Sequence, residues 1–149
     1  MNEAVDALMA TTRLLVGVAT RALEDLGMTL PQFRLLLVLD ELGPSAGTVA
    51  AGRLGTAASS VTRLGDQLEA SGHLTRRRDP ANRSVVVLEP SAAGRAVVDT
   101  VLTRRRDALA ELVARLPPEQ RTALTAALSA LREAAGADYG TGPVELMTP

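Results

Sequence analysis

Apolar residues recur at helical spacing over most of the chain. The first such stretch, from about residue 3 to residue 26, repeats aliphatic side chains every three or four positions, and Gly27 follows it as a stop signal. A second stretch, TLPQFRLLLVLDELG, has Thr29 near its start, Pro31 in its first turn and Gly43 past its end. Its run of leucines leaves almost no polar face. We therefore predict two helices, the second of them at the centre of the core.

Two shorter helices are predicted next. PSAGTVAAGRLG has Ser45 as its expected N-cap and Gly55 as its exit. SSVTRLGDQLEASG, residues 59–72, begins with Ser59 or Ser60 as its expected N-cap. Helical spacing gives this segment two unlike faces. One face carries Val61, Leu64 and Leu68, and the other carries Ser59, Ser60, Thr62, Arg63, Asp66 and Gln67.

The pattern changes after Gly72. Residues 73–79 and 84–90 are short runs, and the second is rich in β-branched residues. The turn-forming sequence DPANR separates them. We therefore predict a β-hairpin with an arginine at its tip.

Helical spacing returns at Ser91, which is the expected cap of a long helix. Its arginines 104–106 are expected on a solvated face, paired with Asp107 or other acids. A last helix is predicted from Pro118 to near Gly136. Residues 137–149 show no period and are expected to form a mobile tail.

The composition excludes several classes of protein. The 149 residues are enough for one domain, and the absence of cysteine excludes disulfides and thiolate metal sites. Glu3, Asp6 and Arg13 interrupt the apolar residues of the first 20 positions, which therefore resemble neither a signal peptide nor a membrane span. We expect a cytoplasmic protein with no membrane partner.

Positive charge is concentrated in the middle of the chain. The net charge is only -1, and all 16 basic residues are arginines. Residues 53–106 hold 10 arginines and 5 acids, whereas residues 1–52 and 107–149 each hold 3 arginines and 6 acids. Clustered positive charge indicates a polyanionic partner.

The order helix, turn, helix, hairpin is that of a winged helix-turn-helix, whose second helix lies in the major groove of duplex DNA. The polar face of residues 59–72 fits that role. Ser59 or Ser60, with the free N–H groups of the first turn, can accept a phosphate. Arg63 can address guanine or phosphate and Gln67 can address adenine, with Thr62 on the same face.

The predicted hairpin supplies a second set of candidate DNA contacts. Because strand neighbours alternate sides, Arg76 and Arg78 are expected on one side and Arg77 on the other. Arg83 lies at the tip, where a slender turn can place a guanidinium in the minor groove. We therefore expect Arg76, Arg78 and Arg83 to bind DNA.

Over residues 3 to 136 the sequence resembles the MarR family of bacterial transcription regulators. SSVTRLGDQLEASG is similar to the recognition helix of the family, TRRRDPANRSVVVLEPSAAGR to its wing and the start of its dimerisation helix, and LPQFRLLLVLDELGP to its second helix. The resemblance implies a mainly α fold with a small β-hairpin wing and long N- and C-terminal dimerisation helices. It also implies a homodimer that represses nearby genes from a palindromic DNA site and leaves the DNA when a small molecule binds between the dimerisation and reading parts.

In these terms residues 1–136 form one domain. The resemblance places its DNA-reading part at about 30–90 and its dimerisation helices at about 3–26 and 91–136.

Several residues depart from the family pattern. Asn82 and Ser84 flank Arg83 where an acid and a second arginine are usual, which reduces the expected affinity of the wing. Gly65 replaces an aliphatic residue in the recognition helix, at a cost of about 1 kcal/mol in helix propensity. Glu89 stands where a threonine is usual.

The weakened wing and Gly65 motivate an alternative function. In that alternative the chain is a winged-helix protein-interaction module or antirepressor with weak or no DNA reading.

No catalytic set, metal site or cofactor site is visible in the sequence. The chain has one histidine, no cysteine and no cluster of metal ligands, so we expect no enzyme activity and no cofactor. His73 is expected to be structural rather than a pH switch. Phe33 and Tyr139 are the only aromatic residues, so the candidate residues for a small-molecule effector are Met9, Arg13 and Phe33.

Overall fold

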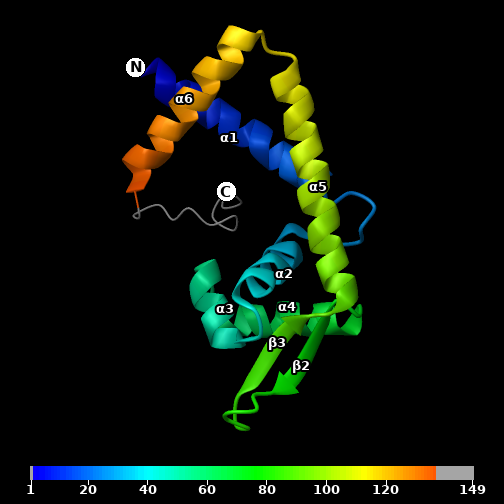
Figure 1. Cartoon of the computed structure of the whole chain (residues 1–149). Coiled ribbons are helices and arrows are strands. Elements are labelled where there is room, and N and C mark those ends of the chain that lie inside the picture. The colour runs from blue at the N-terminus through cyan, green and yellow to red at the C-terminus, as the bar shows by residue number, and fades with distance from the viewer. Residues whose placement is uncertain (1, 137–149) are drawn as a thin grey trace. The chain divides into compact units, whose positions relative to one another are not determined.

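The structure is a computed structural model that describes residues 2–136. The elements follow in the order α1 (Glu3–Arg21), α2 (Leu30–Leu42), β1 (Ser45–Ala46), α3 (Gly47–Leu54), α4 (Ala58–Ala70), β2 (Leu74–Arg78), β3 (Val86–Pro90), α5 (Ala92–Ala114) and α6 (Pro118–Ala135) (Figure 1). The predicted mainly helical fold with a β-hairpin is confirmed. The predicted tail, residues 137–149 with Tyr139, lies outside the described residues.

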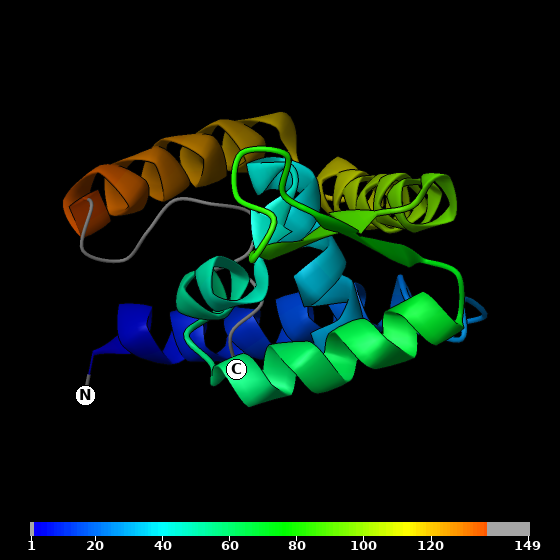
Figure 2. The ribbon, with the colours of Figure 1, turned by 90° about the horizontal axis from the view of Figure 1, so that it is seen from below.

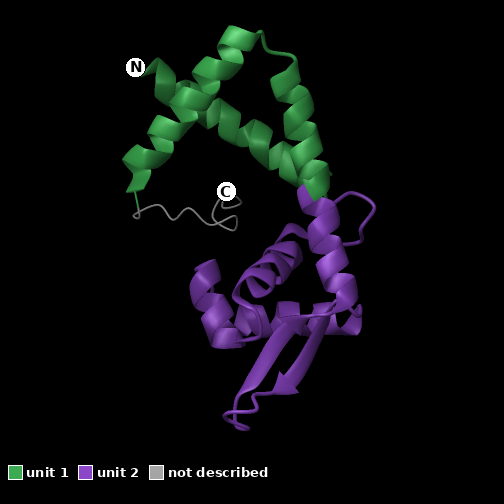
Figure 3. Ribbon diagram, viewed as in Figure 1, with its two compact units in different colours: residues 1–22, 103–149 green, residues 23–102 purple. Residues whose placement is uncertain are grey.

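The chain divides into two compact units (Figure 3). Unit 1 contains residues 1–22 and 103–149, and unit 2 contains residues 23–102. Helix α5 contributes its first part to unit 2 and its second part to unit 1. The predicted DNA-reading part, at about 30–90, lies within unit 2.

Helix α2 is the centre of unit 2. Its N-terminus is closed by a capping box in which Thr29 and Gln32 each hydrogen-bond the other's backbone N–H. Six α2 side chains are buried: Phe33, Leu35, Leu36, Leu37, Val38 and Leu39. The small residues Ala50 and Ala51 of α3 are buried as well. The predicted central position of this helix is confirmed, because burial on nearly all its sides explains the absence of a polar face.

The three strands form one antiparallel sheet in the order β1-β3-β2. β2 and β3 are the predicted hairpin, with Arg76 opposite Leu88 and Arg78 opposite Val86. β1 was not predicted: it pairs Ser45 with Leu88 on the other side of β3. Figure 1 shows the hairpin projecting from the helices of unit 2.

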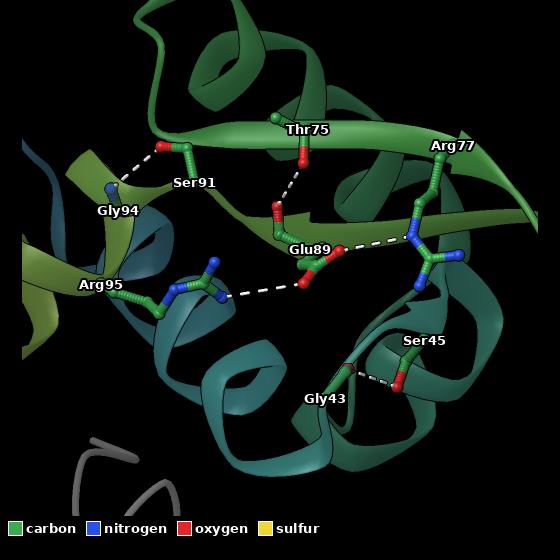
Figure 4. Close-up of polar contacts among 8 residues, drawn as sticks. All are labelled: Gly43, Ser45, Thr75, Arg77, Glu89, Ser91, Gly94 and Arg95. Carbon is green, nitrogen blue, oxygen red and sulfur yellow. Dashed lines mark hydrogen bonds and ion pairs between the residues drawn. The ribbon is translucent and has the colours of Figure 1, made fainter.

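The first turn of α5 joins the end of the hairpin to the segment that follows α4. Figure 4 shows the bond between Ser91 and Gly94 at this junction. Ser91 caps α5 as predicted, because its Oγ accepts a hydrogen bond from the N–H of Gly94 at 3.1 Å. The same hydroxyl donates to the carbonyl of Gly72 at 2.7 Å, and the N–H of Ser91 donates to the carbonyl of His73 at 3.0 Å. Gly94 lies so close to the His73 carbonyl that a Cβ at this position would overlap it.

Unit 1 leaves much of its apolar surface exposed. None of the residues of α6, all of which the structure describes, is buried, and Figure 2 shows α6 well apart from α1. Seven large apolar side chains of α1, the unit 1 part of α5, and α6 are at least 39% exposed: Val5, Leu8, Met9, Leu14, Val113, Leu128 and Leu131. Among residues 2–136, no helix is both long and apolar enough to cross a membrane.

The arginines 104–106 do not form the uniformly solvated face expected from the sequence. Arg104 and Arg106 are exposed, but Arg105 is partly buried and its desolvation lowers the pKa of its guanidinium. Arg104 donates to the carbonyl of Ala22 at 3.3 Å, an interaction within unit 1.

Three predicted details of helix ends are wrong. The first helix ends at Arg21 rather than near 26, because a turn follows in which Asp25 and Gly27 have positive φ. The buried Leu23 lies in this turn and extends the apolar pattern beyond the helix, which explains the wrong prediction. Ser45 is no cap: it lies in β1 and its hydroxyl donates to the carbonyl of Gly43. Ser59 and Ser60 lie inside α4, whose N-cap is Ala57 without a side-chain cap.

We predict that Gly94→Ala destabilises the protein by about 2 kcal/mol or more, because the new methyl group can be accommodated only by moving backbone. The measurement is the free energy of unfolding in urea. The matched control is Gly52→Ala on α3, where a Cβ meets nothing within 4 Å and the gain in helix propensity stabilises by about 1 kcal/mol. Equal effects of the two substitutions would show that the contact at His73 is unimportant.

Candidate nucleic-acid interface

Helix α4 has one buried face and one exposed face. Val61, Leu64 and Leu68 are buried against the rest of unit 2, as predicted. The opposite face is exposed and carries Ser59, Thr62, Arg63, Asp66 and Gln67. Ser60 is half-buried. The amphipathic pattern therefore fixes which side of α4 is available to a partner.

The exposed polar side chains of α4 differ in whether they already have hydrogen-bond partners. The hydroxyl of Thr62 donates to the carbonyl of Ala58 at 3.1 Å, within the helix. The side-chain carbonyl of Gln67 accepts from the amide of Gln32 on α2 at 3.1 Å. Arg63 has no hydrogen bond or ion pair with any of residues 2–136. Arg63 is therefore a cation that remains available on this face.

Arg76 clamps the hairpin onto α4. Its guanidinium lies 2.7 Å from a carboxylate oxygen of Asp66 and 2.7 Å from one of Glu69, and it also donates to the carbonyl of Thr62 at 3.4 Å. The guanidinium is partly shielded, because the Arg76 side chain is only 26% exposed. Charged hydrogen bonds to two carboxylates fix both the position of β2 and the direction of this side chain.

Gly65 makes room for the Arg76 clamp. A Cβ on Gly65 would lie 3.0 Å from Nη2 of Arg76, so a larger side chain at this position would push the guanidinium away from the helix. The glycine lowers the propensity of α4, but it lets the guanidinium lie close to the helix backbone.

The sequence pattern did not predict these ion pairs of Arg76, which we expect from the sequence to bind DNA. A signal was available: Asp66 and Glu69 are three residues apart on one face of a predicted helix and can face a single cation.

The other two strand arginines also have partners within unit 2. Arg77 donates through Nε to Glu89 on β3 at 3.4 Å, and the other oxygen of Glu89 lies 3.8 Å from Arg95 on α5 (Figure 4). Arg78 donates to the carbonyl of Arg83 at 3.1 Å. Arg76, Arg77 and Arg78 therefore have three different sets of partners, and the prediction that Arg76 and Arg78 share one side of the strand stays a prediction. Glu89, which departs from the family pattern, joins two strands and a helix.

The tip of the hairpin is ordered by two side-chain turns. The carboxylate of Asp79 accepts from the N–H of Ala81, and the side-chain carbonyl of Asn82 accepts from the N–H and the hydroxyl of Ser84. Arg83 lies between them and is exposed, without a side-chain partner among residues 2–136. The replacement residues Asn82 and Ser84 thus hold the turn that presents Arg83.

The candidate effector residues do not share one cavity. Met9 and Arg13 line a depression of about 340 Å³ on α1, with Thr12 and Val16. Phe33 belongs to unit 2 and is fully buried in its core. Its complete burial is that of a packing residue, and it does not line the depression that contains Met9 and Arg13.

The one histidine of the chain makes only a local contact in the structure. The Nδ1 atom of His73 lies 2.8 Å from the hydroxyl of Ser71, a local contact. Within the described part of the chain, no three His, Cys, Asp or Glu side chains are arranged to hold a metal ion.

We predict that Gly65→Ala changes stability little in the otherwise unchanged protein, because the helix-propensity gain of about 1 kcal/mol is offset by displacement of Arg76. In an Arg76→Ala background, the same substitution should stabilise by about 1 kcal/mol. The measurement is a double-mutant cycle of urea unfolding free energies.

The control for this cycle is Gly52→Ala, whose effect should be the same in both backgrounds. An equal effect of Gly65→Ala in the two backgrounds would mean that Gly65 does not serve the clamp.

Comparison with known proteins agrees with this arrangement. A sequence model of the MarR family matches residues 28–86. The HTH-type transcriptional regulator YsmB of Bacillus subtilis is 31% identical over 90 residues, which cover 60% of this chain and 62% of YsmB, so the chain spans less than two thirds of that relative. The crystal structure of RV1404 from Mycobacterium tuberculosis is 34% identical, with a TM-score of 0.81 and coverage of 89% of this chain and 92% of RV1404. A MarR family protein from Bacillus stearothermophilus is 25% identical, with a TM-score of 0.76 and coverage of 90% and 97%. Together with the winged helix-turn-helix described above, these matches show that the chain belongs to the MarR family.

Proposed function

We propose that this chain is a DNA-binding transcriptional regulator that reads duplex DNA with the exposed face of α4 and with the hairpin as a wing. The observation that carries the proposal is the division of α4 into a buried aliphatic face and an exposed face with Thr62, Arg63 and Gln67. A helix held in this way presents hydrogen-bonding side chains to the edges of bases. The MarR family is one of transcriptional regulators and not of enzymes.

Phosphate contacts fit the same surface. The first turn of α4 has no side-chain cap, and within residues 2–136 the carbonyl of Ala57 accepts only from the N–H groups of Ser60 and Val61. The N–H groups before Ser60 and the hydroxyl of Ser59 therefore remain available to a phosphate at the positive end of the helix dipole. Arg83 at the tip of the wing is exposed, as Arg63 on the helix is. Since Arg76 and Arg78 hold unit 2 together, we assign them the positioning of the wing and assign DNA contact to Arg63 and Arg83.

The proposal includes a homodimer. The exposed apolar side chains of unit 1 lie on three helices and include Leu8 of α1 and Leu128 and Leu131 of α6. Burial of the exposed half of each such side chain against a second copy is favourable by about 1 kcal/mol. A two-fold axis would then present two copies of α4 to a palindromic operator.

A dimer bound to an operator that overlaps a promoter blocks transcription, so we propose a repressor that acts in the cytoplasm, where bacterial DNA lies. A small-molecule effector that alters the dimer would release the operator.

The protein-interaction alternative loses part of its basis. It rested on the altered wing and on Gly65, and the contact of Gly65 with Arg76 gives this glycine a role in joining wing and helix.

We predict that Arg63→Ala lowers affinity for the operator about 10- to 100-fold, because a guanidinium that reads a base edge is lost. The measurement is fluorescence anisotropy with the DNA upstream of the gene, at several salt concentrations. Each phosphate neutralised should contribute about -0.9 to the slope of log K against log salt. Arg132→Ala on α6 is the matched control and should bind as the unchanged protein does. The absence of any binding at low salt with excess protein would eliminate the regulator proposal.

We predict that Leu128→Glu raises the dimer dissociation constant about 10-fold or more, because a charge replaces an apolar side chain that the dimer buries. The measurement is sedimentation equilibrium. Leu42→Glu, at an exposed leucine of unit 2, is the control and should remain dimeric. A monomeric unchanged protein at micromolar concentration would contradict the proposed dimer.

A further inference from the structure

A chain of two hydrogen bonds connects the N-terminus of α2 with the exposed face of α4. The backbone N–H of Thr29 donates to Oε1 of Gln32 at 2.9 Å, and Nε2 of Gln32 donates to Oε1 of Gln67 at 3.1 Å. Gln32 is half-buried, whereas Gln67 is exposed. The hydrogen-bond chain therefore ends on the face of α4 to which we assign DNA reading.

The first donor fixes the direction of both side-chain amides. A backbone N–H can only donate, so the atom of Gln32 that it meets must be the side-chain oxygen. The nitrogen of Gln32 then faces Gln67, and this nitrogen can only donate as well. The side-chain oxygen of Gln67 must therefore face Gln32, and its NH₂ group lies on the other side of the planar amide.

The outward end of Gln67 is consequently a hydrogen-bond donor. Its NH₂ group makes no hydrogen bond with any of residues 2–136. A glutamine reads adenine with both ends, because it donates to N7 and accepts from the N6 amino group. Gln67 has only the donor end available, since its oxygen is turned toward Gln32. The pairing with adenine that the residue type alone suggests is therefore disfavoured.

From this arrangement we propose that Gln67 selects guanine in the major groove and that Gln32 is the positioning residue that determines this choice. Guanine presents two adjacent acceptors there, N7 and O6, whereas cytosine presents a donor. Arg63 lies one helical turn before Gln67 on the same exposed face, and it too can only donate. The inference rests on the proposed reading of DNA by α4 and adds the preferred base.

The experiment determines the base preference of the full chain by selection from a library of duplexes of random sequence. Gln67→Ala identifies the base pair that Gln67 reads, because the preference for guanine at that position should fall about 3- to 10-fold. All other positions should keep their preferred bases.

Gln32→Glu should reverse the preference at that position. One carboxylate oxygen still accepts from the N–H of Thr29, and the other oxygen can only accept from Gln67. The amide of Gln67 must then turn over and present its oxygen to the DNA, so cytosine should be preferred by a similar factor. Gln32→Met frees the Gln67 amide to use both ends, so adenine should be gained at the same position.

Pro31→Glu is the matched control for the added charge. It places a carboxylate at an exposed position in the same turn of α2, outside the hydrogen-bond chain. This substitution should weaken binding to all sequences and leave the preferred bases unchanged.

An unchanged base preference with Gln32→Glu would overturn the inference, as would a preference of the unchanged protein for adenine or one that does not depend on Gln67. In each of these results DNA is still bound, whereas failure of the proposed function means that no duplex is bound at all. A measurement without DNA tests the hydrogen-bond chain itself: the side-chain NH₂ signals of Gln32 in an NMR spectrum should shift with Gln67→Ala. Unshifted signals would also overturn the inference, and urea unfolding confirms that each variant is folded.

Discussion

Unit 2 depends on the close approach of the α5 backbone to the segment between α4 and β2. The Ser91 hydroxyl, the Ser91 N–H and the hydrogen on Cα of Gly94 all meet the backbone of Gly72 and His73. Both strands of the hairpin begin or end at this point. The junction therefore determines where the hairpin leaves the helices, and every contact of the hairpin with α4 follows from it.

The arginines of unit 2 fall into two groups that differ in whether they have partners. Positive charge gathers in the middle of the chain, but the structure separates arginines that hold unit 2 together from arginines that remain available. Arg76, Arg77 and Arg78 are engaged by carboxylates or a carbonyl, whereas Arg63 and Arg83 are exposed and unpaired among residues 2–136. The first group places the elements that carry the second group, so the backbone positions of Arg63 and Arg83 are set before any partner binds.

Periodicity was sufficient to predict the helices, the hairpin and the buried face of α4, because a strong amphipathic pattern has few alternatives. It failed at Ser45 and at Ser59, where a backbone pairing with β3 and an alanine at the cap position decide the ends. It also did not predict the ion pairs of Arg76. The partners of a strand arginine depend on how the strand packs on a helix. The spacing of residues along a single element does not reveal which side chains of another element lie close to it. The DNA contacts of Arg63, Gln67 and Arg83 stay predictions.

The sheet order has a consequence for the behaviour of the protein in concentrated solution. Over the described residues, β2 has no strand on its outer side, which leaves backbone N–H and carbonyl groups open to pairing with another chain. The three consecutive arginines lie along this border, and long charged side chains on an edge strand hinder its pairing with another strand. The arginines that position the wing therefore also protect the molecule against strand-to-strand aggregation.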